Sequence, residues 1–290
     1  MNLPHLHFHR TRIAPTPSGY LHMGNVLAFA ITAALAHKAG ADVLLRIDDM
    51  DRERVRPEYV QDIFDTLQFM DIPYTEGPRD VQQFELDYSQ QVRLPLYHKA
   101  LEQLREKGVV YGCDCTRTQL AGWNMEHGCP GSCREKALAL DAPDVNWRLK
   151  TNLVPMLHVN THEGIVTTTL PAEMTDFVVR KKDGCPAYQL TSLIDDVFYN
   201  IDGIVRGEDL WHSTLAQQNL AAQLAFTSFQ EVLFYHHPLL MNETDKKLSK
   251  SAGATSIQYL RKLGNTSADI YTIIGSLLKP VVNADSWRRW

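Results

Sequence analysis

Hydrophobic and polar residues follow two different periods near the start of the chain, and the change of period predicts the order of the elements. From about residue 6 to 14 they alternate, which is the pattern of a half-buried strand, and two prolines and a glycine in "APTPSGY" end it. The run from Asn25 to Gly40 predicts a helix, and "ADVLLRIDDMD" predicts a second strand. Strand, turn, helix and strand open a βαβ unit, and hence a parallel, doubly wound sheet.

Two more helices are predicted before the composition changes. In "RPEYVQDIFDTLQFMDI" the apolar residues recur at helical spacing, with Pro57 in the first turn. A further helix over "YSQQVRLPLYHKALEQLREKG" ends at Gly108. The stretch 109–175 is rich in Cys, Gly and β-forming residues, so we expect it to be an insertion.

The strand pattern returns after the insertion. "DFVVRKKDGCPAYQLTSLIDD" predicts a β-hairpin across the turn at Asp183 and Gly184, which puts Tyr188 on a strand. "GIVRGEDLWHSTLAQQNLAAQLAF" predicts a strand, a loop and a helix capped by Ser213 or Thr214. The fold class expected from this order is α/β with a doubly wound parallel sheet.

Composition and charge narrow the class of protein. The chain has 290 residues, of which 44% are hydrophobic and 22% charged, which is typical of a folded globular protein. Its longest apolar run is too short to cross a bilayer and no leader-like segment precedes the first strand, so we expect a cytoplasmic protein without a membrane partner. The net charge of -5 does not indicate nucleic acid, although a local basic face can bind RNA on an acidic protein.

Four of the five cysteines lie close together in the insertion. Cys113 and Cys115 form a C-x-C pair, thirteen residues follow, and Cys129 and Cys133 form a C-x3-C pair. Two close pairs joined by a short loop suit a tetrahedral zinc ion bound by four thiolates. Disulfides are the alternative, and they are disfavoured in a cytosolic chain. Such a zinc site is closed and structural, so no catalysis is assigned to it.

Two further stretches suit an anionic ligand. In "LHMGN" a histidine and a glycine stand where a strand leads into a helix, which is either a simple helix cap or a nucleotide site. In "ETDKKLSKSAGATS" three lysines alternate with serines in a turn-prone loop, which suits a polyphosphate or is only a solvated charged loop. Tyr188 and Arg206 could face a pocket at the carboxyl ends of the strands, or Arg206 could pair locally with Glu208 and Asp209.

The order of these motifs carries a family resemblance. "RIAPTPSGYLHMGN", "LLRIDDMD", "DFVVRKKDGCPAYQL", "LIDD", "IVRGEDL" and "KKLSKS" together resemble the catalytic core of a class I glutamyl-tRNA synthetase, from about residue 10 to 260. About thirty residues follow the lysine loop, where that family normally continues into an anticodon-binding region. A short chain with a cysteine zinc site is similar to the glutamyl-Q group of the family. Some of that group have a tyrosine as the third zinc ligand, where this chain has Cys129.

The resemblance implies a Rossmann-type catalytic domain in two halves, 1–108 and 176–255, around a zinc-binding, acceptor-binding-like insertion at 109–175. A short helical segment at 256–290 follows in place of an anticodon-binding domain. It implies activation of L-glutamate with ATP and Mg²⁺, and transfer of glutamate to the queuosine base of tRNA(Asp). A monomer is expected.

The resemblance also implies roles for individual residues. His22, Gly24, Lys247 and Lys250 would bind ATP, and His22, Asn25 and Lys250 would be catalytic. The glutamate site would consist of Arg12, Thr16, Asp48, Tyr188 and Arg206.

Three positions depart from the family pattern. Thr16 replaces a serine and keeps the hydroxyl, whereas Asp48 replaces a glutamate and is one methylene shorter. Asn25 replaces the final histidine of its motif and cannot carry a positive charge. The loss of one charge-assisted contact costs roughly 1.5–3 kcal/mol, which predicts slower adenylation.

Two alternatives to this interpretation stay open. The chain could be a truncated synthetase that charges the terminus of tRNA(Glu). It could also be a catalytically lapsed relative that binds tRNA or an amino acid, which Asn25 and Asp48 would favour. The final "SWRRW" is either a packed tail or a small RNA contact.

Overall fold

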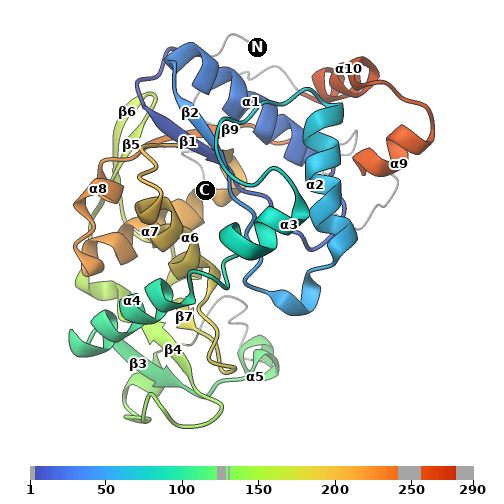
Figure 1. Ribbon diagram of the computed structural model, residues 1–290. Coiled ribbons are helices and arrows are strands. Elements are labelled where there is room, and N and C mark those ends of the chain that lie inside the picture. Colours follow the sequence, from blue (N-terminus) through green and yellow to red (C-terminus); the bar gives the residue numbers. More distant parts are fainter. Residues whose placement is uncertain (1–3, 123–128, 130, 241–255, 279–290) are drawn as a thin grey trace. The chain divides into compact units, whose positions relative to one another are not determined.

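The computed structural model describes residues 4–122, 129, 131–240 and 256–278 (Figure 1). The chain forms two compact units, each assembled from separate stretches of sequence. The first unit comprises residues 1–92, 202–211 and 234–290, and the second comprises residues 93–201 and 212–233. The expected insertion at 109–175 lies inside the second unit. In the described part of the chain, no helix combines the length and apolarity that a membrane span requires.

The first unit contains the predicted βαβ opening. Strands β1 (Arg10–Ile13) and β2 (Asp42–Leu45) pair in parallel, and helix α1 (Met23–Ala39) connects them (Figure 1). Helix α1 ends at Gly40, whose φ of +68° is the left-handed conformation that favours glycine at this position. Strand β8 (Gly203–Gly207) lies against β1 and is a hydrogen-bonded neighbour of β9 (Leu233–His237).

The N-terminal alternation is present, but the predicted strand is shorter. Leu6 and Phe8 are buried and the histidines between them are exposed, yet residues 4–9 form no ladder. Asp202 takes the place of a partner strand, because its carboxylate accepts the backbone N–H of His9 at 2.9 and 3.0 Å. Phe8 packs directly on Gly203, where a Cβ would lie 2.4 Å from the ring. The alternation of hydrophobic and polar residues in this segment therefore reflects alternating burial, and it does not indicate pairing with another strand.

Helices of the first unit flank this core. Helix α2 (Pro57–Phe69) has Pro57 in its first turn, as predicted. Short helices α3 (Val81–Gln83), α9 (Ile257–Lys262) and the longer α10 (Ser267–Leu277) complete the unit. The side chains of Ser256 and Thr266 cap α9 and α10.

The helix predicted from Tyr88 begins later, as α4 (Leu94–Glu106). A π-helical turn over Phe84–Tyr88 precedes it. The buried carboxylate of Asp49 accepts the hydroxyl of Ser89 at 2.6 Å and the backbone N–H of Gln90 at 2.7 Å. These bonds hold residues 89 and 90 in a turn and keep them out of the helix.

The second unit is built around an antiparallel sheet in the order β3, β4, β7. Among the described residues, a hairpin of β5 and β6 and helices α4 to α8 complete the unit. The elements are β3 (Val110–Cys113), β4 (Asn146–Leu149), β5 (Leu157–Thr161), β6 (Gly164–Thr168), β7 (Val178–Arg180), α5 (Arg117–Gly122), α6 (Tyr188–Phe198), α7 (Trp211–Leu224, from His212 onward in this unit) and α8 (Thr227–Gln230).

Two buried ionic clusters hold the second unit together. Arg93 at the start of α4 forms a two-pronged pair with Asp195 of α6, with N···O distances of 2.7 and 3.0 Å. The hydroxyl of Tyr97 donates to the same carboxylate at 2.6 Å. In the turn before β7, Asp176 accepts the guanidinium of Arg134 at 2.6 and 2.7 Å and the hydroxyl of Tyr111 at 2.8 Å. Both carboxylates are almost completely buried, so these bonds offset the cost of their desolvation.

Two local predictions about the second half are wrong. The turn at Asp183 and Gly184 exists, but only a single bridge from Arg180 to Pro186 follows it, and Tyr188 begins helix α6 instead of lying on a strand. Neither Ser213 nor Thr214 caps a helix, because α7 already begins at Trp211 after a 3₁₀ turn at Glu208–Leu210. Buried apolar residues in α6 override its strand-forming sequence.

Candidate active site and metal centre

The motif "LHMGN" forms the N-terminus of α1, and both of its polar side chains belong to the cap. His22 is the N-cap residue, and its Nδ1 accepts the backbone N–H of Gly24 at 3.1 Å. The Oδ1 of Asn25 accepts the backbone N–H of His22 at 3.1 Å, which completes a capping box. The cap satisfies two backbone groups and holds the imidazole at the positive end of the helix dipole, where an anion is favoured.

The His22 ring lies close to Gly24 and leaves little room for a side chain there. A Cβ at Gly24 would lie 3.0 Å from Cε1 and 3.1 Å from Nδ1 of His22. A side chain here would displace the ring, although the helix itself could accept one. The spacing of histidine and glycine is therefore explained by contact between the two residues.

The two arginines of the predicted glutamate site lie on neighbouring strands of the first unit. Arg12 on β1 and Arg206 on β8 are 5% and 4% exposed. An N–H of the Arg12 guanidinium donates to the carbonyl of Val205 at 3.4 Å, next to Arg206. The guanidinium of Arg206 lies 5.6 Å from the ring centre of Phe234 on β9. The structure thus places two buried arginines on neighbouring strands, and arginine is the side chain suited to an anionic substrate.

Asp48 follows β2 and is paired with an arginine that the sequence analysis missed. Its two carboxylate oxygens accept Nε and an Nη of Arg46 at 2.7 and 2.9 Å. Asp48 is 7% and Arg46 2% exposed. The backbone N–H of Arg46 donates to the carbonyl of Ile13 and that of Asp48 to Pro15, both at 2.9 Å, so the pair is anchored to the end of β1. The i, i+2 spacing of Arg46 and Asp48 was the available signal for it.

The remaining predicted site residues are exposed or lie outside the described part of the chain. Thr16 is exposed in the turn after β1. Tyr188 is 45% exposed at the first residue of α6 and belongs to the second unit, whereas the arginines belong to the first. Lys247 and Lys250 lie outside the described residues.

The four cysteines of the insertion form a buried cluster in the second unit. One ligand atom from each of Cys113, Cys115, Cys129 and Cys133 lies within 4.8 Å of the other three. The Sγ atom of Cys115 is 3.8 Å from that of Cys129 and 3.4 Å from that of Cys133, and all four residues are free thiols. A tetrahedral zinc ion with Zn–S bonds of about 2.3 Å separates its sulfur ligands by about 3.8 Å. The residues therefore fit a structural zinc ion, and the disulfide alternative is not observed.

Charged groups surround the cysteine cluster. The carboxylate of Asp114 accepts the thiol of Cys133 at 3.4 Å and the ammonium of Lys136 at 2.7 Å. The ammonium of Lys182 donates to the carbonyl of Asp114 at 2.8 Å. Burial raises the pKa of the Cys115 thiol to about 11, so binding of a metal as thiolates requires proton release.

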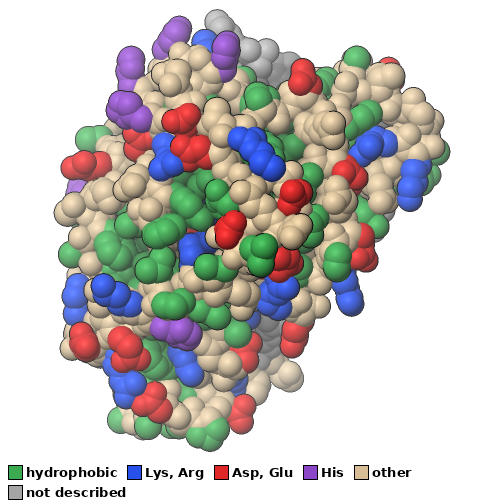
Figure 2. Space-filling view, viewed as in Figure 1, with side chains coloured by type: hydrophobic (Ala, Val, Ile, Leu, Met, Phe, Trp, Pro, Cys, Tyr) green, Lys and Arg blue, Asp and Glu red, His purple; other side chains and the backbone are tan. Residues whose placement is uncertain are grey.

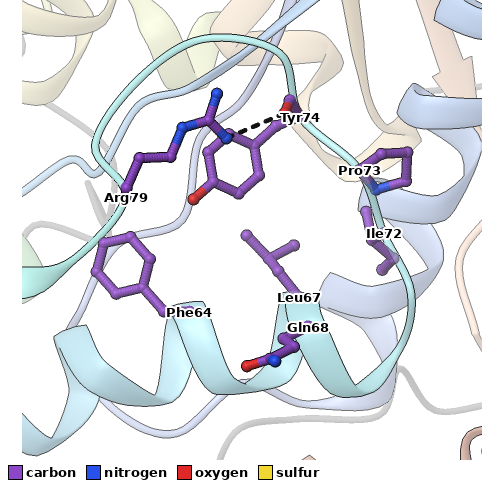
Figure 3. Close-up of a pocket in the computed structure, with 7 residues that line it drawn as sticks. All are labelled: Phe64, Leu67, Gln68, Ile72, Pro73, Tyr74 and Arg79. Atoms are coloured by element: carbon purple, nitrogen blue, oxygen red, sulfur yellow. Dashed lines mark hydrogen bonds between the residues drawn. The ribbon is translucent and has the colours of Figure 1, made fainter.

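A cavity of about 330 Å³ lies on the first unit (Figure 3). Leu67, Gln68 and Phe64 of α2 form one side of it, and the loop after α2 forms the other (Figure 3). The guanidinium of Arg79 lies over the ring of Tyr74 at 4.7 Å and donates to the carbonyl of Thr75 at 2.7 Å. None of the residues that line the cavity is a predicted site residue.

Surface charge is mixed. On the face drawn in Figure 2, Lys and Arg side chains are interspersed with Asp and Glu side chains. This pattern agrees with the net charge of -5 and gives no continuous basic stripe on that face.

Comparison with known proteins connects these features to one family. Residues 9–277 match the family model described as tRNA synthetases class I (E and Q), catalytic domain. The chain is 31% identical to Glutamyl-Q tRNA(Asp) synthetase of Rhodobacter capsulatus over 288 residues, 91% of this chain and 99% of that protein. It is 35% identical to Glutamyl-Q tRNA(Asp) synthetase of Pseudomonas aeruginosa, over 83% of this chain and 76% of that protein.

Longer relatives match over part of their length. Glutamate--tRNA ligase 2 of Syntrophus aciditrophicus is 32% identical over 88% of this chain and 54% of its own. The crystal structure of a glutamate tRNA ligase from Elizabethkingia meningosepticum in complex with its amino acid superposes with a TM-score of 0.68 at 25% identity. It covers 84% of this chain and 52% of that one. With its capped α1, buried arginines and cysteine cluster, the chain belongs to the class I tRNA synthetases for glutamate and glutamine, and it is an aminoacyl-tRNA synthetase-type ligase.

Proposed function

We propose that the protein activates L-glutamate with ATP to form glutamyl-adenylate and transfers the glutamate to the queuosine base of tRNA(Asp). The observation that carries the first step is the pair of buried arginines, Arg12 and Arg206, on adjacent strands of the unit that also presents the His22 cap. Buried guanidinium groups are the preferred partners of a carboxylate, because they bind it with two parallel hydrogen bonds. They favour an acidic amino acid over its amide.

Other polar and charged residues of the site would bind ATP during adenylate formation. His22 at the start of α1 would contact the ATP phosphates, and Gly24 would let the nucleotide approach the backbone. Lys250, with Lys247 beside it, would neutralise charge on the phosphate and the departing pyrophosphate. The α-carboxylate of glutamate attacks the α-phosphorus of ATP, the bond from that phosphorus to the bridging oxygen breaks, and pyrophosphate leaves.

The carboxylate of Asp48 would bind the α-ammonium group of glutamate. Its oxygens accept Nε and an Nη of Arg46, which fixes the direction of the carboxylate, and a carboxylate is the side chain that binds an ammonium with charge-assisted hydrogen bonds. Thr16 and Tyr188 would supply hydroxyl groups to the same substrate.

Two metal ions belong to the proposal. Zinc would be held by Cys113, Cys115, Cys129 and Cys133. It would join the end of β3 and the residues just after it, which carry the first two cysteines, to the segment that carries the other two. Mg²⁺ would come with ATP and supply charge neutralisation on its phosphates. The cysteine site has no open ligand position, so zinc is given no part in the reaction.

The acceptor is assigned from the relatives. Proteins named Glutamyl-Q tRNA(Asp) synthetase are 31–35% identical to this chain, and we transfer tRNA(Asp) as the acceptor from their name. Glutamate--tRNA ligases of similar identity support charging of a tRNA terminus as the second candidate.

The test separates activation from transfer. Purified protein with ATP, Mg²⁺ and glutamate should exchange labelled pyrophosphate into ATP, and Lys250→Ala should abolish this exchange. Labelled glutamate should then pass to tRNA(Asp) that contains queuosine and not to tRNA from cells that lack it. Labelling that survives without queuosine supports terminal charging. Absence of exchange in zinc-loaded protein contradicts the activation step and favours a relative that only binds tRNA or an amino acid.

A further inference from the structure

Leu21, the residue before His22, is held through its backbone from two sides. Its N–H donates to Oδ2 of Asp62 on α2 at 2.9 Å, and its carbonyl accepts the N–H of Ile257 at 2.8 Å. Leu21, Asp62 and Ile257 are 3%, 4% and 0% exposed. Both bonds therefore lie in the interior of the first unit, where loss of one partner leaves a buried polar group unsatisfied.

The hydrogen bond from Ile257 to Leu21 belongs to a short antiparallel pairing between the start of α1 and the start of α9. His22 and Ser256 form an antiparallel bridge, one residue along from Leu21 and Ile257. Ser256 is the N-cap of α9, and its hydroxyl accepts the backbone N–H of Tyr259 at 3.2 Å. The residue that caps α1 is thus paired with the residue that caps α9. Ser256 follows Lys250 by six positions in the sequence.

Asp62 is buried on α2, where its carboxylate accepts the backbone N–H of Leu21. Burial raises the pKa of its carboxyl group, while the hydrogen bond from Leu21 and the charge of Arg261 act in the opposite direction. A carboxylate in an apolar interior costs free energy unless it receives hydrogen bonds. On α2, the cavity residues Phe64 and Gln68 face another side of the helix, so Asp62 is not part of that cavity.

We propose that Asp62 is a positioning residue for adenylation, which fixes the Leu21 backbone so that His22 and Ser256 stay in register. This inference rests on the proposed function, in which His22 contacts the ATP phosphates. Asp62 touches neither ATP nor glutamate; it acts through Leu21. A misplacement of about 1 Å at a catalytic group can reduce the rate about 100-fold, so a small shift of this register is sufficient to be measured.

The first experiment removes the donor at Ile257. Ile257 is the first residue of α9, a position whose backbone angles proline can adopt, and Ser256 at φ -72° and ψ 144° has the conformation that a residue before proline prefers. Because the Ile257 N–H is hydrogen-bonded here, a proline ring would take its place against the Leu21 carbonyl and remove the bond. Ile257→Pro and Ile257→Ala both shorten the buried side chain, but only the proline removes the N–H. We expect kcat for pyrophosphate exchange to be at least about tenfold lower in Ile257→Pro than in Ile257→Ala, with similar KM for glutamate.

The second experiment removes the acceptor. Asp62→Ala deletes it, whereas Asp62→Asn keeps an amide oxygen that can accept the Leu21 N–H. Asp65→Asn is the matched control, because it removes one charge from the same helix at a residue whose carboxylate binds Gln61. We expect Asp62→Ala to lose about tenfold in kcat, Asp62→Asn to recover most of it, and Asp65→Asn to be unchanged. Thermal unfolding identifies variants that are folded.

The outcomes separate this inference from the function on which it rests. Folded Asp62→Ala and Ile257→Pro proteins that turn over as fast as Asp65→Asn and Ile257→Ala overturn the positioning role while leaving the function intact. If Asp62→Ala does not fold, Asp62→Asn and the Ile257 pair decide the question. Wild-type protein without pyrophosphate exchange overturns the proposed function, and the positioning role with it.

Discussion

The amide oxygen of Asn25 accepts the backbone N–H of His22 at 3.1 Å, so Asn25 is part of the structure that holds His22. The resemblance led us to expect that Asn25 takes the place of a charged ligand of ATP. The capping box gives this position a second role, in which an oxygen acceptor is required and a positive charge is not. The side chain can still turn its two N–H donors outward.

Replacement of Asn25 should therefore affect stability as well as rate. We expect Asn25→Ala to lower the free energy of unfolding by about 0.5–1 kcal/mol, because the N–H of His22 loses its acceptor. Asn25→Gln keeps an acceptor and should stay near wild type. Asn25→His should be no faster in pyrophosphate exchange than wild type. Faster exchange by Asn25→His would instead restore the interpretation that wild type lacks a charged contact.

Gly24→Ala should change stability and activity in opposite directions. Alanine is about 1 kcal/mol better than glycine in a helix, so the unfolding temperature should stay the same or rise. The new Cβ would lie 3.0 Å from the His22 ring and displace it, so KM for ATP should rise. Thermal unfolding and steady-state exchange at varied ATP measure the two effects. An unchanged KM would mean that the imidazole position does not matter for ATP binding.

Removal of Arg46 should be more damaging than removal of the whole Arg46–Asp48 pair. Arg46→Met leaves the buried Asp48 carboxylate without its two-pronged partner, which typically costs about 3–5 kcal/mol. The double variant Arg46→Met, Asp48→Leu should recover much of this free energy of unfolding but should not activate glutamate. Urea denaturation compares the two proteins. Equal destabilisation in both would show that the pair contributes through packing and not through its charges.

The cysteine cluster predicts a zinc content of one ion per chain. Cys133→Ser removes one of four thiolates and should lower the bound zinc and the thermal stability of the second unit. Cys185→Ser is the matched control, because Cys185 is not in the cluster. Elemental analysis after dialysis against a chelator measures the difference. Equal zinc loss in both variants would contradict a site at the cluster.

The hydrogen bonds of Asp176 should make the free energy of unfolding fall at acid pH. Burial alone would raise the pKa of its carboxyl group, but hydrogen bonds from Arg134, Tyr111 and Thr151 lower it below the ordinary value near 3.8. The stabilising contribution of a carboxyl group with a lowered pKa is present above its unfolded pKa and is lost as the pH falls through its folded pKa. Asp176→Asn should cost about 1.5–3 kcal/mol at pH 7, and the difference from wild type should shrink below about pH 4. Urea denaturation at several pH values measures this difference, and a constant one would contradict it.

Elements defined by local pattern were predictable. The βαβ opening and α2 follow from hydrophobic period, proline and glycine positions, which act within a few residues. The cysteine spacing identified the four residues that cluster, because one short loop can bring two close pairs together at little cost in chain entropy. The late start of α4 was not predictable, because Asp49 binds Ser89 and Gln90 from forty residues away in sequence.

The sequence by itself determined which residue types are available for the chemistry: the histidine and glycine at a helix start, the arginines on strands and the cysteine pairs. Tertiary structure alone decided how they are held. It placed Tyr188 on a helix and joined Leu21 to Asp62 and Ile257 through backbone hydrogen bonds. Local periodicity reports burial and turn chemistry, whereas a buried charge is positioned by whichever distant group satisfies its hydrogen bonds, and that partner has no fixed sequence spacing.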